Sequence, residues 1–237
     1  MSEYSIFSLG DQAVSLEITG HEIDPSVHAT LMSMKQWLEK NPFTGMQDIV
    51  LGYRSISVTF DLFAVTNSGV SNVSAIVKEK LVAAFAVGKN QHTQLPSRHV
   101  KIPVCYNEKF GMDIPALCEH NGLSVDEVVE LHTNKSYNVY LVGFLPGFPY
   151  LGFVDHRLEM PRHPSPRAIV PAGSVGIAGK QTGIYPFDSP GGWQIIGRTP
   201  LKMFDPHRMP PVLIEAGDTV TFFSIDEQEF ERLQKLP

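Results

Sequence analysis

One segment in the second half of the chain, residues 143–200, combines glycine, proline and aromatic residues and constrains the fold most strongly. It holds ten of the 19 glycines and nine of the 18 prolines. Glycine permits turns and close backbone approach, whereas proline fixes φ and stiffens a loop. Such a composition is typical of disorder only when large apolar residues are scarce. Here they are frequent: Phe144, Phe148, Tyr150, Phe153, Ile177, Tyr185, Phe187, Trp193, Ile195 and Ile196. The segment is therefore predicted to form a rigid surface of tight turns.

The same segment is locally basic in an acidic protein. Between residues 160 and 200 four cationic side chains face the single carboxylate of Asp188, whereas the whole chain has a formal net charge of −6. The cations are Arg162, Arg167, Lys180 and Arg198. Arginine binds carboxylate and phosphate groups through paired hydrogen bonds, so this surface suits a small anionic ligand. Ordinary solvated charges on loops are the alternative interpretation.

The composition excludes several classes of protein. The 237 residues, 43% hydrophobic and 19% charged, suffice for one large or two modest globular domains. No run of Lys and Arg is present, so nucleic acid is not expected as a partner. No apolar run approaches the roughly 18 residues of a membrane helix, so no membrane partner is expected either. Cys105 and Cys118 are expected to be reduced thiols, which places the protein in the cytoplasm.

Residues 1–90 have the pattern of a small α/β domain. The order of predicted elements is ββαββα, typical of helices packed on one face of a sheet. Asp24-Pro25 marks the start of the first helix, since Asp caps and Pro fits the first turn. Ser71 caps the second helix, which is predicted to end near Gly88. The elements are strands 4–9 and 13–18, helix 25–40, strands 46–51 and 55–60, and helix 71–88.

Residues 98–237 form the second predicted domain, after a polar boundary at residues 88–98. Ser124 and Glu127 form a capping box. The two short helices resemble a DNA-binding pair but carry acidic residues where phosphate contacts would be needed, which excludes that function. Short strands separated by Gly/Pro turns favour a barrel or sandwich. The expected elements are strand 99–105, helices 114–119 and 125–132, strand 137–144, and a closing hairpin of strands 212–215 and 219–224.

Three familiar catalytic motifs are absent. Lys180 follows glycine, but Ser174 and Gln181 occupy positions where a phosphate-binding loop needs Gly and Ser/Thr. Residues 172–176 miss a nucleophile elbow because Ala172 replaces its first glycine, so Ser174 is interpreted as a turn residue. The nine histidines show no zinc-binding spacing. No metal and no biotin attachment are expected on this chain.

The remaining polar groups of the segment are sufficient for a ligand pocket. A pocket needs a few convergent polar groups on a rigid apolar frame. The candidates, besides the four cations, are Ser174, Gln181, Tyr185, Trp193 and Gln194. His132 is the candidate titrating group, and its place at a helix end leaves a C-terminal cap as the alternative.

Long motifs of this segment resemble the allophanate hydrolase subunit 1 family, which includes the 5-oxoprolinase component PxpB and KipI-type inhibitors of sporulation kinases. The resemblance is tight over residues 99–220 and loose over the first 90. The motifs that carry it are GFLPGFPYLG (143–152), VPAGSVGIAGKQTGIYP (170–186), SPGGWQIIGRT (189–199) and FDP (204–206), preceded by VVELHTNKSYNVYLVGF (128–144).

The resemblance implies an α+β protein in which a small α/β domain precedes a cyclophilin-like β-barrel domain. It implies a hydrolase component that acts with an A subunit and a C subunit of related fold. Together these open 5-oxoproline to L-glutamate with ATP hydrolysis. In urea amidolyase-type enzymes the related domain belongs to a biotin-dependent carboxyltransferase half.

Roles follow from this expectation. The four cations would bind the anionic substrate, and backbone N–H groups of a glycine nest would hold developing charge. The nest would comprise Gly173, Gly176, Gly191 and Gly192. His132 would transfer a proton. Three alternatives stay open. The surface binds a proline-containing segment of a histidine kinase without chemistry, or the chain is the subunit 1 component of an allophanate hydrolase or urea amidolyase-type complex. In the third, the chain is a scaffold whose site lies on the C subunit.

Overall fold

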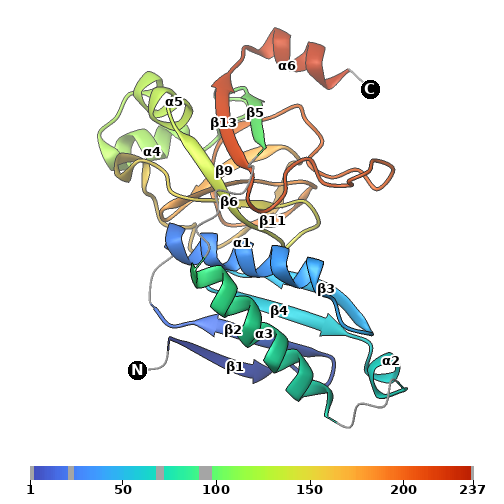
Figure 1. The fold of residues 1–237 in the computed structure, drawn as a ribbon. Coiled ribbons are helices and arrows are strands. Elements are labelled where there is room, and N and C mark those ends of the chain that lie inside the picture. The colour runs from blue at the N-terminus through green and yellow to red at the C-terminus, as the bar shows by residue number, and fades with distance from the viewer. Residues whose placement is uncertain (1–2, 21–23, 68–71, 91–97, 236–237) are drawn as a thin grey trace. The chain divides into compact units, whose positions relative to one another are not determined.

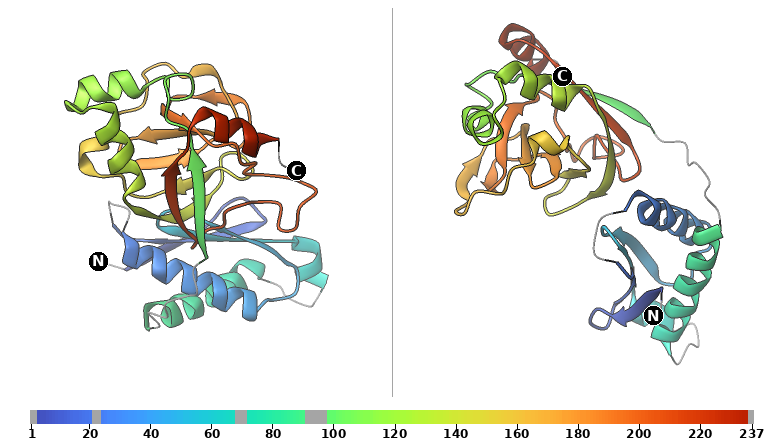
Figure 2. Two further views of the ribbon diagram at one scale, coloured as in Figure 1. Left: turned by 90° about the horizontal axis from the view of Figure 1, so that it is seen from above. Right: turned by 90° about the vertical axis from the view of Figure 1, so that its left-hand side faces the viewer.

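The computed structural model describes residues 3–20, 24–67, 72–90 and 98–235 (Figure 1). The chain divides into two compact units, residues 1–96 and 97–237 (Figure 2). The boundary predicted at residues 88–98 falls largely outside the described ranges. Among the described helices, none is both long and apolar enough to cross a membrane.

The first unit is one antiparallel sheet with two long helices on the same face, as Figure 1 shows. The strand order is β1-β2-β4-β3. Alternate residues of β4 are buried, including Ile56 and Val58, and these side chains form the core with apolar residues of the helices. The elements are β1 (Tyr4–Ser8), β2 (Ala13–Ile18), α1 (Pro25–Lys40), β3 (Met46–Leu51), β4 (Ser55–Phe60), α2 (Leu62–Asn67) and α3 (Val73–Asn90).

Helix boundaries in this unit follow local chemistry, with two exceptions. The Asp24 carboxylate accepts a hydrogen bond from the Ser26 amide at 2.7 Å, and Pro25 occupies the first turn, as predicted. The short helix α2 was not predicted, and Ser71 lies outside the described residues. The last helix of this unit, α3, ends at Asn90, two residues after the predicted end near Gly88, so Gly88 lies inside the helix and does not cap it.

Gly88 has a packing role instead of a capping role. A Cβ at this position would lie 2.8 Å from the carbonyl oxygen of Thr30 and 3.0 Å from Cγ of Met34, both on α1. The missing side chain therefore lets the backbones of α1 and α3 approach closely. A glycine in a helix costs about 1 kcal/mol relative to alanine, and here close packing offsets that cost.

The second unit is built on a curled seven-stranded sheet of order β12-β9-β10-β7-β6-β13-β5. Its two edge strands meet at one end, because Cys105, just after β5, exchanges both backbone hydrogen bonds with Arg198 of β12, at 2.9 and 3.0 Å. A small ribbon of order β11-β8 accompanies it. The strands are β5 (His99–Val104), β6 (Ser136–Val142), β7 (Pro149–Leu151), β8 (Arg167–Val170), β9 (Ser174–Ala178), β10 (Gln181–Ile184), β11 (Ser189–Gly191), β12 (Gln194–Arg198) and β13 (Thr219–Ser224).

Helices of the second unit cover the curled sheet and supply part of its core. The Ser124–Glu127 capping box is present as predicted, so the first-turn donors of α5 are satisfied. Leu117 of α4 and Val128 of α5 are completely buried against the sheet. The helices are α4 (Ile114–Asn121), α5 (Val125–Thr133), the 3₁₀ turn η1 (His156–Leu158) and α6 (Glu227–Gln234).

The predicted closing hairpin is wrong. Residues 212–215 form no strand, apart from an isolated bridge between Val212 and Phe204. Strand β13 instead pairs in parallel with β5, from Thr219↔His99 to Ser224↔Val104, and antiparallel with β6. Figures 1 and 2 show β5 and β13 side by side. After the turn at residues 216–218, β13 therefore pairs with β5, more than 100 residues earlier, and local alternation cannot indicate such a pairing.

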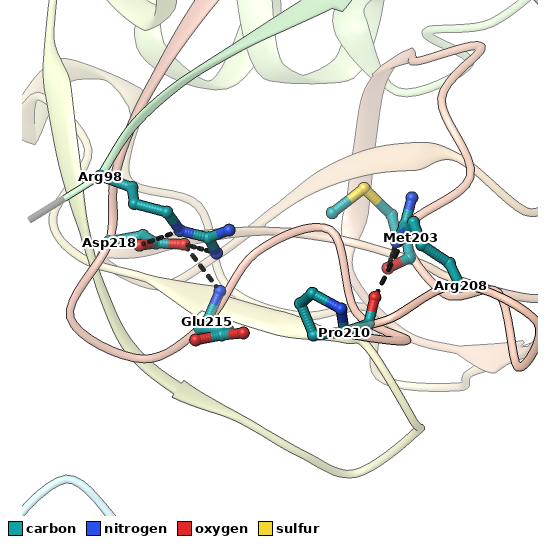
Figure 3. A network of polar contacts seen from close by, with 6 residues as sticks. All are labelled: Arg98, Met203, Arg208, Pro210, Glu215 and Asp218. Atoms are coloured by element: carbon teal, nitrogen blue, oxygen red, sulfur yellow. Dashed lines mark hydrogen bonds and ion pairs between the residues drawn. The ribbon is translucent and has the colours of Figure 1, made fainter.

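Arginine side chains hold the connection that leads to β13 (Figure 3). Arg98 binds the Asp218 carboxylate with both Nε and Nη2, at 3.0 and 2.6 Å, and the Glu215 amide donates to the same carboxylate at 2.8 Å. Arg208 donates to the carbonyl oxygens of Pro210 and Pro211 at 3.3 and 3.2 Å. The Asp218 side chain is only 7% exposed, so its charge depends on these donors.

We expect Asp218→Asn to lower the free energy of unfolding of the protein by about 2 kcal/mol, because a buried carboxylate then loses its charge-assisted bonds. Chemical denaturation monitored by circular dichroism measures this change. The control is Glu229→Gln, which breaks an exposed pair with Arg232 and should change stability little. Equal effects of the two substitutions would contradict the importance of burial.

Candidate functional site

A pocket of about 300 Å³ lies in the second unit, within the glycine- and proline-rich segment. The turn between β6 and β7, the loop before β8, and the end of β11 form its walls. Its lining residues are mainly aromatic residues, prolines and glycines, with one cation: Phe144, Phe148, Tyr150, Arg162, Pro166, Tyr185, Pro190, Gly191, Gly192 and Trp193. Ligand sites are commonly concave and apolar with few polar groups, as here.

Packed aromatic rings form the floor of this pocket. Phe148 contacts Tyr185 and Trp193 edge to face, with ring centroids 5.2 and 5.4 Å apart. This geometry places positive ring edges on negative ring faces and adds about 1 kcal/mol per pair beyond burial. Gly191 makes room for the cluster, because a Cβ there would lie 2.3 Å from the Tyr185 hydroxyl. The floor is therefore rigid and shaped before any ligand binds.

Arg162 is the cation of the pocket. Its guanidinium carbon lies 5.7 Å from the centroid of the Trp193 ring, within cation–π range. Among the described residues no ion pair is found for Arg162. Its side chain is solvent-accessible, so the charge is available to an anion entering the pocket.

Two phenols face the same cation. Burial raises the pKa of Tyr150 and of Tyr185 above the ordinary value. The positive charge of Arg162 offsets part of the rise for Tyr150, and for Tyr185 a hydrogen bond with the Trp193 backbone does so more strongly than Arg162. Both hydroxyls are therefore protonated at neutral pH and can donate hydrogen bonds. The pocket combines a cation, two phenols and aromatic walls, which suits a small ring-shaped ligand with a carboxylate.

Phe144 stands at the rim of the pocket in an unusual conformation. Its φ is +68°, the left-handed region that bulky residues rarely adopt, and its side chain is 70% exposed. Such backbone costs about 1 kcal/mol or more and persists where the surroundings impose it. Here the Gly143 amide donates to the Phe148 carbonyl at 3.0 Å and closes the turn.

Five predicted site residues line the pocket together: Arg162, Tyr185, Gly191, Gly192 and Trp193. Lys180 and Gln181 lie elsewhere, at the turn between β9 and β10, where Lys180 is exposed. Arg198 donates from Nε to the Ala172 carbonyl at 2.7 Å, and its guanidinium lies 6.0 Å from the rings of both Phe110 and Phe230. Arg198 therefore contacts α6 through Phe230.

Two predicted binders lie outside the pocket lining and contact the chain near Arg162. Arg167 pairs with the Asp113 carboxylate at 2.5 Å. Gln194 is buried and donates from Nε2 to the Pro161 carbonyl at 2.8 Å. Neither residue lines the pocket, and both hold the chain on either side of Arg162.

The other members of the predicted nest are committed to the sheet. The Gly173 amide donates to the Tyr185 carbonyl at 2.7 Å, and a Cβ on Gly173 would lie 2.3 Å from the Thr199 carbonyl. Gly176 lies inside β9, and a Cβ there would lie 3.0 Å from Cβ of Trp193. Ser174 is the buried first residue of β9 and also the last residue of the preceding turn, since its amide donates to the Pro171 carbonyl at 3.1 Å. Of the predicted nest, Gly191 and Gly192 reach the pocket.

His132 lies in the core, not in the pocket. The residue is completely buried, stacks on Phe222 at 4.5 Å, and bonds to the Tyr106 hydroxyl at 2.8 Å and the Thr182 hydroxyl at 3.0 Å. Burial lowers the pKa of His132 from 6.5 to about 3, so the ring is neutral at physiological pH. Its position at the end of α5 and its two hydroxyl partners favour a structural role.

Sequence reasoning did not name Phe148, Tyr150 or Asp113 as site residues. Aromatic residues in a folded segment are ordinary core candidates, and the pocket became visible only from their arrangement. Asp113 reaches the site region by pairing with a residue 54 positions later, Arg167. Within the described residues no group of three or more His, Cys, Asp or Glu side chains could hold a metal ion.

Comparison with known proteins gives the family. A family model described as the carboxyltransferase domain, subdomain C and D, matches residues 4–214. The chain belongs to this family. The match spans every residue that lines the pocket and ends before β13 and α6.

Relatives in this carboxyltransferase-domain family include enzyme subunits. The chain is 41% identical over 230 residues to the B subunit of 5-oxoprolinase from Bacillus subtilis (strain 168), covering 96% of this chain and 95% of that protein. The crystal structure of TTHA0988 is 33% identical with a TM-score of 0.75, and the alignment covers 91% of this chain but 40% of that longer one. Urea amidolyase of K. lactis, 19% identical, has a TM-score of 0.75 over 97% of this chain and 15% of that chain, and shows the fold alone.

We expect His132 to make stability pH-dependent. As pH falls through 6.5 the unfolded chain takes up a proton at this position, whereas the folded protein does so only near the depressed pKa of about 3. The contribution of neutral His132 is therefore complete above pH 6.5 and is lost progressively between about pH 6.5 and 3, with a slope approaching about 1.4 kcal/mol per pH unit.

Denaturation curves of the wild type and His132→Gln between pH 7 and 4 measure this contribution. The variant should show a flatter pH dependence. His120→Gln, at an exposed position of α4, is the matched control and should follow the wild type. Parallel curves for the wild type and His132→Gln would contradict the buried neutral histidine.

Proposed function

We propose that this chain is the B subunit of an ATP-dependent 5-oxoprolinase, which opens 5-oxoproline to L-glutamate together with A and C subunits. The observation that carries the proposal is the 41% identity to a 5-oxoprolinase component of the same kind over nearly the full length of both chains. The chain is therefore a component of a cytoplasmic hydrolase that is active only with its partners.

The chemistry of the substrate fits the pocket. 5-Oxoproline is a five-membered lactam with one carboxylate. In our proposal the carboxylate pairs with Arg162, the ring lies on the aromatic floor, and the phenols of Tyr150 and Tyr185 donate to the lactam oxygen. An unstrained lactam also needs activation of its carbonyl, which ATP would supply by phosphorylation of the amide oxygen.

ATP itself is assigned to a partner subunit. Arg162 is the single cation among the lining residues, which is insufficient for a triphosphate, and the chain has no phosphate-binding loop. The C subunit is the proposed neighbour of the second unit. In TTHA0988 and in urea amidolyase the related region covers only 40% and 15% of longer chains, so in those proteins it is joined to further sequence.

We also infer that the curled sheet is a cyclophilin-like barrel.

The same pocket favours a second candidate function. Its aromatic walls and exposed rim residue Phe144 suit a proline ring of a partner protein. In that case the chain is an inhibitor of a sensor histidine kinase and performs no chemistry. An equivalent role in an allophanate hydrolase or urea amidolyase-type complex has only the fold in its support.

Reconstitution separates these functions. The purified chain, mixed with its A and C subunits, is expected to release glutamate from 5-oxoproline only when ATP is present, and no mixture that lacks one subunit should do so. A complete mixture without turnover would refute the oxoprolinase proposal. Suppression of kinase autophosphorylation by this chain alone would favour the inhibitor.

Arg162→Gln tests the place of the substrate. We expect the KM for 5-oxoproline to rise about 10- to 100-fold with kcat nearly unchanged, because a charge-assisted contact to the ground-state carboxylate is lost. Arg157→Gln is the control, since Arg157 is exposed, pairs with Asp155 and does not line this pocket. An unchanged KM for Arg162→Gln would place the substrate elsewhere in the complex.

A further inference from the structure

Asp113 directly precedes α4, at the N-cap position, yet its carboxylate does not cap that helix. The side chain is 6% exposed and turns to β12, where Oδ2 accepts a hydrogen bond from the Ile195 amide at 2.6 Å. The backbone amide of Asp113 donates in return to the Ile195 carbonyl at 2.9 Å. A buried carboxylate is costly unless it is paired. Asp113 is therefore held firmly between α4 and the sheet.

The other carboxylate oxygen contacts the loop that carries Arg162. Oδ1 accepts from Nη2 of Arg167 at 2.5 Å and lies 3.4 Å from Nε2 of His163. The His163 contact is not a hydrogen bond, because Nε2 makes none among the described residues. One buried oxygen thus faces a side chain directly after Arg162 and another at the start of β8.

Backbone contacts fix the immediate neighbours of Arg162. The Pro161 carbonyl accepts from Nε2 of Gln194 at 2.8 Å, and the His163 amide donates to the Gly192 carbonyl at 2.7 Å. Arg162 itself has its cation–π contact with Trp193. Its position over the ring is thus set by the loop on both sides, not by an ion pair of its own.

Asp113 gives different surroundings to two arginines that lie five residues apart, Arg162 and Arg167. Asp113 neutralises Arg167, whose Nη1 is buried and makes no hydrogen bond among the described residues. Without the carboxylate, the partly buried Arg167 cation would lose its counter-charge and would move toward solvent. Its loop would move with it, and Arg162 would leave its place over the indole ring.

We propose that Asp113 is a positioning residue, which holds the loop through Arg167 and His163 so that Arg162 lies over Trp193 and faces the pocket. The part of this inference that concerns 5-oxoproline binding rests on the proposed function. The part that concerns the place of Arg162 does not.

The position of Arg162 can be measured without any ligand. A guanidinium over an indole ring has side-chain NMR resonances shifted upfield by the ring current, and Arg162→Lys identifies the Nε–Hε signal in the full-length chain. We expect Asp113→Asn to abolish this upfield shift. Asp113→Asn should also raise the KM for 5-oxoproline of the reconstituted complex about 10- to 100-fold with kcat nearly unchanged, as misplacement of a binding group does.

Asp218→Asn is the matched control. Asp218 is also a buried carboxylate that binds an arginine and a backbone amide (Figure 3), but it lies just before β13 and its hydrogen bonds among the described residues go to Arg98 and Glu215, not to the loop of Arg162. It should lose stability while the Arg162 resonance and the KM stay as in the wild type. Equal changes in the two variants would reduce Asp113 to a general stability role.

A second variant covers the case in which Asp113→Asn does not fold. Arg167→Gln leaves Asp113 with its hydrogen bond from the Ile195 amide and offers an amide donor in place of the guanidinium, so the variant should fold, and loss of the charge pair should also shift the Arg162 resonance. An unchanged resonance in folded Asp113→Asn, or in Arg167→Gln, would overturn the proposal. A lost ring-current shift without any oxoprolinase turnover of the wild-type complex would keep the positioning role and refute the proposed function.

Discussion

The curled sheet of the second unit depends on how its two edges meet. Strand β5 pairs in parallel with β13, and the next residue, Cys105, exchanges both backbone hydrogen bonds with Arg198 of β12. This pairing removes part of the open edge that a sheet otherwise exposes. It also brings the chain that follows β5 to β12, where the Asp113 amide and carboxylate both bond to Ile195. The contacts of Asp113 that hold the loop beside the pocket therefore depend on the place where the two edges of the sheet meet.

The pocket shows how rigidity and charge are divided between residues. The aromatic floor of Phe148, Tyr185 and Trp193 gives shape, and the absence of a Cβ at Gly191 permits it. Arg162 supplies a charge that no ion pair among the described residues neutralises. Arg167, five residues later, is neutralised by Asp113. Two arginines in one basic segment thus have different roles, one toward the ligand and one toward the frame.

Local chemistry made much of the fold predictable. Asp24-Pro25 and the Ser124–Glu127 box begin their helices as expected, because capping involves residues within one turn. Alternating strands such as β4 were also predicted, because the alternation of buried and exposed residues is visible within a few residues. The pairing of β13 was not, because its partner β5 lies far away in sequence. Gly88 was interpreted as a helix cap, whereas a side chain is absent there because it would clash with Thr30 on another helix.

The sequence by itself determined the family, the two-part organisation of secondary structure, and the segment that holds the pocket, including Arg162 and Trp193. Those conclusions rest on composition, periodicity and long motifs, all of which are local. Only the tertiary structure decided which polar residues face the pocket. In the folded protein His132 is buried against Tyr106 and Thr182. Arg198 lies over the rings of Phe110 and Phe230, and Asp113 contacts the loop of Arg162. The reason is that burial and pairing depend on strands that meet across long stretches of chain.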